Sequence, residues 1–151
     1  ITQYEWASPT LFELRVAITL PVQWGDMDAF GHVNNTVPIR WFESARIAYL
    51  ERVGLSEMMD KGGVGPILAA IHCNYRKQVE YPDTVHIGAR VGRIGRSSFT
   101  MEHAAASDAG QWICVEGEST IVVFDYNAQR PVRVPAEIRA AVEELEGKRF
   151  D

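Results

Sequence analysis

Two carboxylates, an imidazole and two carboxamides lie within one short stretch near the beginning of this 151-residue chain. The stretch runs from Trp24 to Asn35 and includes Asp26, Asp28 and His32. A carboxylate held beside the start of a helix can activate water, while unpaired N–H groups of the first helical turn stabilise an oxyanion. These residue types, in this order, are suited to acyl-transfer chemistry.

Asp28 is the residue of this stretch that we expect to carry the reaction. It could deprotonate a water molecule or attack a carbonyl carbon itself, and the alternative is an aspartate that only caps a turn. We expect Asp26 to be a structural turn residue after Gly25, and Gly31 to supply a positive φ angle. The role of His32 stays open: it could act as an acid or base, contact substrate, or be a hydrogen-bonded structural histidine.

The segments on either side of this stretch are predicted from the spacing of their apolar residues. Strict alternation from Leu14 to Trp24 predicts a half-buried strand. From Thr36 to Val53 the apolar residues recur at helical steps, and Pro38 is tolerated only in the first turn of such a helix. The candidate N-cap residues of this helix are Asn34, Asn35 and Thr36.

The rest of the chain predicts a sheet and a short final helix. Alternating residues predict four further strands, at 67–77, 84–94, 98–107 and 112–124, and a helix follows at 135–147. A sheet with one apolar face must be covered, and the long helix is the element able to do so. The predicted fold class is α+β, in which a curved antiparallel sheet of five or six strands wraps one long central helix. We expect a single domain over residues 1–151.

Composition excludes several classes of function. The net charge of −5 gives no electrostatic footprint for nucleic acid, and no stretch approaches the ~20 apolar residues that span a bilayer. No signal-peptide pattern opens the chain. Cys73 and Cys114 lie far apart and are expected to be free thiols, with Cys73 in the core. We therefore expect a cytoplasmic protein that binds neither nucleic acid nor membrane.

Two further groups of polar residues leave alternatives open. Glu43 either forms an ion pair with Arg46 on the long helix or faces the site as a second carboxylate. Arg96, Ser97 and Ser98 lie at a turn between two strands, where they could bind phosphate or form a solvated hairpin end. The remaining histidines lie singly on strands, so we expect no metal site.

The stretch from Trp24 to Asn35, followed by Arg40-Trp41-Phe42-Glu43 and Ala45-Arg46, resembles the hot-dog-fold acyl-CoA thioesterases. It is most similar to the 4-hydroxybenzoyl-CoA thioesterase type, and the order of elements fits over residues 11–127. The resemblance implies a catalytic aspartate at Asp28 and a helix N-terminal amide at Asn35 that polarises the thioester. Two residues depart from related enzymes: Asn35 replaces Tyr or His, and Phe30 replaces the Asn found in acyl-carrier-protein thioesterases, although His32 matches their histidine.

The resemblance also implies a substrate and an assembly. Arg96, Ser97 and Ser98 would contact the nucleotide phosphates of coenzyme A, which is part of the substrate, so no cofactor is expected. Active sites of the family form between subunits, which implies a homodimer or a dimer of dimers. The leading hypothesis is hydrolysis of acyl-CoA to a carboxylic acid and CoA. The alternatives are a non-hydrolytic acyl-thioester-binding protein and a hydratase or dehydratase on the same fold.

Overall fold

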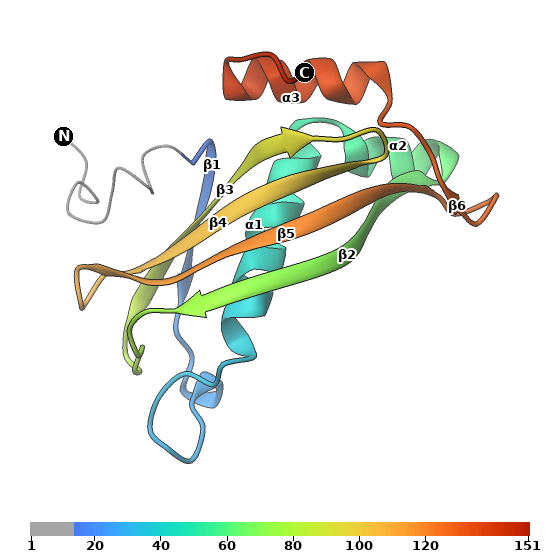
Figure 1. The fold of residues 1–151 in the computed structure, drawn as a ribbon. Helices are drawn as coiled ribbons and strands as arrows, with labels where there is room; N and C mark the ends of the chain where they lie inside the picture. Colours follow the sequence, from blue (N-terminus) through green and yellow to red (C-terminus); the bar gives the residue numbers. More distant parts are fainter. Residues whose placement is uncertain (1–13) are drawn as a thin grey trace.

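The computed structural model describes residues 14–151 and shows a curved sheet wrapped around a long helix (Figure 1). The first thirteen residues of the expected single domain lie outside the described residues. The helices are α1 (Val37–Arg52), α2 (Leu55–Gly62) and α3 (Ala136–Glu146). The strands are β1 (Val16–Pro21), β2 (Val64–Tyr75), β3 (Thr84–Ile94), β4 (Ser98–Ser107), β5 (Trp112–Asp125) and β6 (Arg130–Pro131).

The sheet is antiparallel throughout and has the strand order β1-β3-β4-β5-β2, with β6 paired to β5. The predicted α+β class, with one long helix wrapped by five or six strands, is therefore confirmed. β1 and β2 are the two edges of the sheet, although β2 precedes β3 and β4 in the chain. This order places the end of β2 beside the loop that joins β1 to α1 (Figure 1).

Some predicted boundaries were wrong, for reasons of hydrogen bonding. β1 ends at Pro21, because Trp24–Asp26 forms a 3₁₀ turn, and Trp24 is 75% exposed rather than half-buried. β2 begins at Val64 because its pairing with β5 extends beyond its apolar alternation, as far as Asp125. β6 lies between the predicted strand at 112–124 and the predicted helix at 135–147, where no strand was expected.

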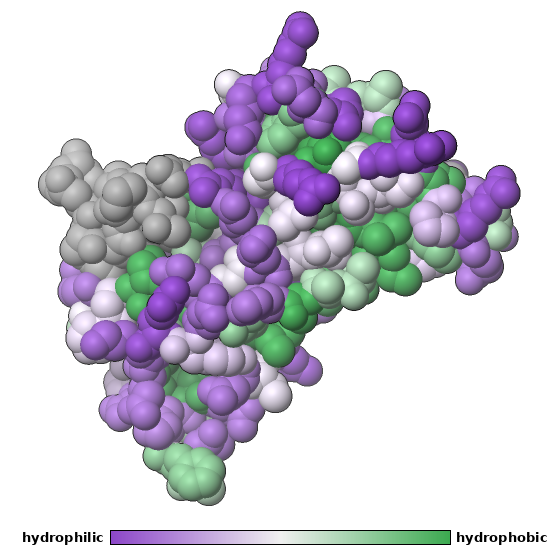
Figure 2. Space-filling view, viewed as in Figure 1, coloured by the Kyte–Doolittle hydropathy of each residue, from purple (hydrophilic) through white to green (hydrophobic). Residues whose placement is uncertain are grey.

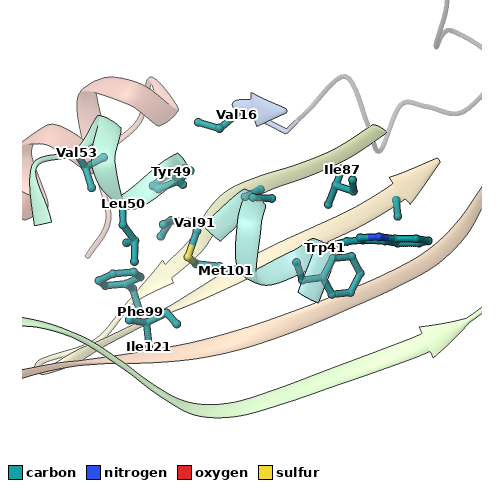
Figure 3. Close-up of a cluster of buried hydrophobic side chains, with 14 of the residues drawn as sticks. Val16, Trp41, Tyr49, Leu50, Val53, Ile87, Val91, Phe99, Met101 and Ile121 are labelled. Carbon is teal, nitrogen blue, oxygen red and sulfur yellow. The ribbon is translucent and has the colours of Figure 1, made fainter. Parts of the chain in front are cut away.

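The core lies between α1 and the concave face of the sheet (Figure 3). Phe42, Ala45 and Tyr49 of α1 are fully buried there, one helical turn or two apart, as the apolar period predicts. Ile39 was also placed in this apolar stripe, but it is 36% exposed. It lies instead on one flank of α1 together with Glu43 and Ile47, which are exposed too. We call Ile39, Glu43 and Ile47 the α1 flank.

One histidine is enclosed in this core. His103 on β4 is 3% exposed, its Nε2 lies 2.8 Å from the Ser119 hydroxyl, and its ring stacks on Phe42. Burial, with the nearby charge of Arg46, lowers the pKa of His103 to about 4. The folded protein therefore keeps this imidazole neutral where the unfolded chain, near its ordinary pKa of 6.5, takes up a proton.

This difference in proton uptake makes stability depend on pH. Between about pH 6.5 and pH 4 the unfolded state binds the proton and the folded state does not, so we expect stability to fall by about 3 kcal/mol as the pH falls. His103→Gln keeps a polar group opposite Ser119 and does not titrate. Urea unfolding at pH 7 and pH 4.5 should show a smaller loss for this variant. Equal losses in the variant and the wild type would contradict the assignment.

Candidate active site

A cavity of about 430 Å³ lies between the loop that follows β1 and the end of β2. Asp28, His32 and Asn35 line it from the loop side, and Tyr75 lines it from β2. The structure therefore brings three of the four predicted catalytic residues to one cavity. The fourth, Glu43, is exposed on the α1 flank and does not line this cavity.

The loop holds Asp28 in a tight turn. The N–H of Gly31 donates to the Asp28 carbonyl at 3.1 Å, and the N–H of Asp28 donates to the His32 carbonyl at 2.9 Å. Gly31 has φ of +84°, as predicted, which side chains larger than hydrogen adopt at a cost. The predicted structural role of Asp26 is confirmed, since its carboxylate accepts the Gln23 N–H at 2.8 Å.

The Asp28 carboxylate is oriented by two donors. Its Oδ1 accepts the Phe30 N–H at 2.9 Å, and its Oδ2 lies 3.4 Å from the side-chain nitrogen of Asn34. The other end of the Asn34 amide accepts the N–H of Thr36 at 2.9 Å and its hydroxyl at 2.7 Å. Asn34 thus forms a turn directly before Thr36, which is the candidate that occupies the N-cap of α1, and it also ties the carboxylate to the start of the helix. Each carboxylate oxygen keeps a lone pair for a further donor such as water.

Asn35 presents a backbone N–H at the start of α1. The N–H groups of Thr36 and Val37 both donate to Asn34, whereas the Asn35 N–H meets no acceptor within residues 14–151. Asn35 lines the same cavity as Asp28. The positive end of the α1 dipole adds to its attraction for developing negative charge.

Tyr75 is a residue of the cavity that the sequence pattern did not single out. Its hydroxyl donates to the Asn35 carbonyl, which fixes the peptide next to the unbonded N–H. Partial burial and then the neighbouring Cys73 thiol raise the pKa of Tyr75, so the phenol remains a donor at neutral pH. Its position on the same strand face as Cys73 could have indicated that it faces inward.

The cysteines are free thiols, as predicted. Cys73 is half-buried and packs against the core, and burial raises its pKa. Burial raises the pKa of Cys114 to about 12. A thiol acts as a nucleophile through its thiolate, so neither side chain is primed for attack at neutral pH.

The walls of the cavity are apolar toward the core and basic toward one rim. The apolar residues are Phe30, Val33, Pro38, Val79 and Val115. Arg76 and Lys77, directly after β2, supply positive charge, although Arg76 also lies 3.7 Å from Glu116. Phe30 is 82% exposed and so extends from the loop into solvent. The cavity can accept an apolar group beside an anionic one.

Glu43 does not form the ion pair that was expected within α1. Among residues 14–151 no oxygen of Glu43 lies within 4.0 Å of the Arg46 guanidinium, and its charge acts only at longer range. Arg46 is 7% exposed, so it is buried beside the core, whereas Glu43 faces outward. The helix turns the two side chains to different sides of the boundary between core and solvent.

Arg96 and Ser97 lie in the turn between β3 and β4, and Ser98 begins β4, at the end of the sheet remote from the Asp28 loop (Figure 1). Arg96 lines a second hollow of about 680 Å³. Three further arginines also line it: Arg93, Arg133 and Arg139. The phosphate-binding residues expected from the resemblance are therefore not beside Asp28 of the same chain.

Within residues 14–151, no group of three or more His, Cys, Asp or Glu side chains is arranged to hold a metal ion. No helix in the same range is both long and apolar enough to cross a bilayer.

The fold is that of the hot-dog thioesterases, and comparison with known proteins agrees. Residues 22–142 match the thioesterase-like superfamily, so the chain belongs to this family. A solved thioesterase from Thermus thermophilus, complexed with coenzyme A and Zn, is 28% identical and superposes with a TM-score of 0.81 over 91% of this chain and 98% of its own.

Two other proteins extend the comparison. The PA2801 protein of Pseudomonas aeruginosa is 35% identical, with a TM-score of 0.76 over 85% of this chain and 98% of its own. The long-chain acyl-CoA thioesterase FadM of Escherichia coli is 23% identical over 79% of this chain and 90% of its own. The predicted class of enzyme, a thioesterase, is confirmed.

Proposed function

We propose that this protein hydrolyses acyl-CoA thioesters to free carboxylic acids and CoA in the cytoplasm. The observation that carries the proposal is that Asp28 and Asn35 line one cavity, and that the Asn35 N–H has no acceptor within residues 14–151. The description of the FadM relative as an acyl-CoA thioesterase supports the choice of CoA as the carrier. The two free thiols fit a reducing compartment.

The chemistry follows from the two groups. The thioester oxygen accepts the Asn35 N–H, which polarises the carbonyl and stabilises the oxyanion of the tetrahedral intermediate. Asp28 removes a proton from water as the oxygen attacks the carbonyl carbon, or attacks that carbon itself to give an anhydride that water then opens. The carbon–sulfur bond breaks, the thiolate of CoA takes up the proton, and the acid leaves.

His32 has a role in the proposed reaction, whereas Glu43 has none. His32 lines the cavity, and its ring makes no hydrogen bond within residues 14–151, so it is available to contact substrate or to protonate the leaving thiolate. Glu43 does not line the cavity of its own chain, so we give it no part in bond breaking.

We propose a homodimer in which the outer edge of β2 pairs with β2 of a second copy. β2 has 12 residues and ends the sheet, so its outer backbone groups face no strand of the described chain. Ile67 and Leu68 on this strand are 39% and 40% exposed, and Figure 2 shows hydrophobic side chains along this side of the sheet. An exposed apolar edge strand favours pairing with another copy.

The homodimer also allows a role for the arginine-lined hollow in substrate binding. β3 alone separates the Asp28 end of the sheet from Arg96 by about 30 Å. We therefore propose that Arg96, Ser97 and Ser98 contact the nucleotide phosphates of an acyl-CoA whose thioester lies at another subunit's Asp28. Guanidinium groups bind phosphate through charge-assisted hydrogen bonds.

Release of free thiol from acyl-CoAs with short, medium, long and aromatic acyl groups tests the proposed reaction. We expect turnover with at least one acyl class, together with the free acid by mass spectrometry. Tight binding without turnover across the set would instead identify a non-hydrolytic acyl-thioester-binding protein. A product heavier by one water that retains CoA, formed from enoyl-CoA, would identify a hydratase.

A further inference from the structure

Arg46 is a buried cation with an unmet donor. The residue is 7% exposed, and within residues 14–151 its Nη1 atom is fully buried and has no hydrogen-bond acceptor. Burial lowers the pKa of this guanidinium, which shows that its surroundings oppose the charge. Proteins rarely bury a charge without a partner, because the loss of hydration is costly.

The elements packed around Arg46 do not supply that partner. His103 of β4 is neutral, its Nε2 is bonded to Ser119 of β5, and its Nδ1 also lacks a partner within the described residues. Phe42, one turn earlier on α1, stacks on the His103 ring and offers only its face. Glu43 is the acidic group whose charge acts on Arg46, but no oxygen of Glu43 is within 4.0 Å of it in the same chain.

Arg46 lies next to an uncovered surface. Residues of a helix are turned by about 100° from one to the next, so Arg46 lies between the buried side of α1 and the exposed α1 flank of Ile39, Glu43 and Ile47. A Cβ atom on Gly117 of β5 would lie 2.9 Å from the ring of Phe42, so Phe42 reaches β5, which neighbours the edge strand β2. Arg46 points from α1 in a direction next to that of Phe42. This is the side on which the proposed homodimer forms.

We propose that the Arg46 guanidinium is neutralised by Glu43 of the partner subunit. In a twofold dimer, a contact from one residue to another is repeated in the opposite direction. One chain carries a buried cation without an acceptor and, three residues earlier, a carboxylate with no ion pair among residues 14–151. When the α1 flanks of two copies face each other, each Arg46 meets Glu43 of the other copy, so two ion pairs form. Ile39 and Ile47 supply apolar contact on either side of each pair. The inference rests on the proposed homodimer.

The pair has a consequence for affinity. Removing one member leaves a buried charge without compensation at two symmetric places in each dimer. We expect Glu43→Arg and Arg46→Glu each to raise the dimer dissociation constant by about 30-fold or more, because like charges then meet. Glu51→Arg changes another exposed carboxylate of α1, one on the opposite side of Glu43 from Arg46, and should leave the dissociation constant near that of the wild type.

Mixing the two charge-reversed variants distinguishes an ion pair between subunits from a structural role of these residues within one chain. A Glu43→Arg subunit carries two positive groups on this flank, and an Arg46→Glu subunit carries two negative ones. Sedimentation equilibrium should show both variants dissociated alone and associated as a heterodimer when mixed, with helical circular dichroism confirming that each is folded. Folded variants that do not associate would overturn the inference, as would a wild-type dissociation constant for Glu43→Arg.

A further variant tests the inference if the Arg46→Glu protein does not fold. Glu43→Gln leaves the buried arginine unchanged and should raise the dissociation constant less than Glu43→Arg does. Equal values for wild type, Glu43→Gln and Glu43→Arg would overturn the inference without the second variant. A wild-type protein that stays monomeric would also overturn it, whereas release of thiol from acyl-CoA, measured on the same preparation, tests the proposed reaction separately.

Discussion

Asp28→Asn is expected to lower kcat for acyl-CoA hydrolysis by about 1,000-fold, the range found when a general base is removed. The substitution keeps the shape of the side chain and an oxygen that can accept the Phe30 N–H. It removes the group that takes a proton from water or attacks the carbonyl. It also places an NH₂ group against the side-chain amide of Asn34, whose orientation is fixed by Thr36, so a loss of about 1 kcal/mol of stability is expected.

Initial rates of thiol release, measured at a temperature well below the Tm of the variant, separate the two effects. Asp26→Asn is the matched control, since Asp26 lies in the same loop and accepts a backbone N–H from Gln23. That control should retain activity. If folded Asp28→Asn protein turned over acyl-CoA at the wild-type rate, Asp28 would have no part in the reaction.

Asn35→Pro is expected to lower kcat by about 100- to 1,000-fold, as the loss of one oxyanion donor does in other acyl-transfer enzymes. Proline removes the backbone N–H and leaves the carbonyl that accepts the Tyr75 hydroxyl. We expect the backbone to accept proline here, because Asn35 is the second residue of a turn in which the Val37 N–H donates to the Asn34 carbonyl at 3.0 Å. Proline is favoured at this position of a type I turn.

Asn35→Ala is the control that separates backbone from side chain. It keeps the N–H and removes the carboxamide, so its kcat should stay within a few-fold of the wild type. Steady-state kinetics on both variants, with circular dichroism to confirm α1, decide the question. A proline variant as active as the alanine variant would show that the oxyanion is held by another donor.

Local pattern was enough to predict the parts of this molecule that depend on neighbouring residues. The helical period after Thr36 and the proline near its start predicted α1, which begins at Val37. The turn chemistry of Gly31 and the N-cap position at Thr36, one of three candidates, were predicted in the same way. The extent of β1 was not, because alternation continues to Trp24 while the 3₁₀ turn that follows Gln23 ends the ladder.

Features that depend on distant pairing were not predicted from sequence. Tyr75 reaches the cavity because β2 pairs with β5 and forms the edge of the sheet. This pairing places the Tyr75 hydroxyl against Asn35, a residue 40 positions earlier in the chain. Arg133 and Arg139 join Arg96 through the packing of the segment after β6. Arg46 was considered only as a partner of Glu43 on the same helix, and a helical period carries no information about an acceptor from another chain.

The place of β2 in the sheet has a consequence for how the molecule gains its activity. β2 is made before β3 and β4 but can pair only after β5, its neighbour in the sheet, is present. Such non-local pairing has an entropic cost, that of closing a long loop, before any new contact compensates for it. The Asp28 turn and α1 depend on local contacts, whereas the wall that carries Tyr75 depends on that closure. Catalytic competence is thus a property of the completed sheet, and it comes late in folding.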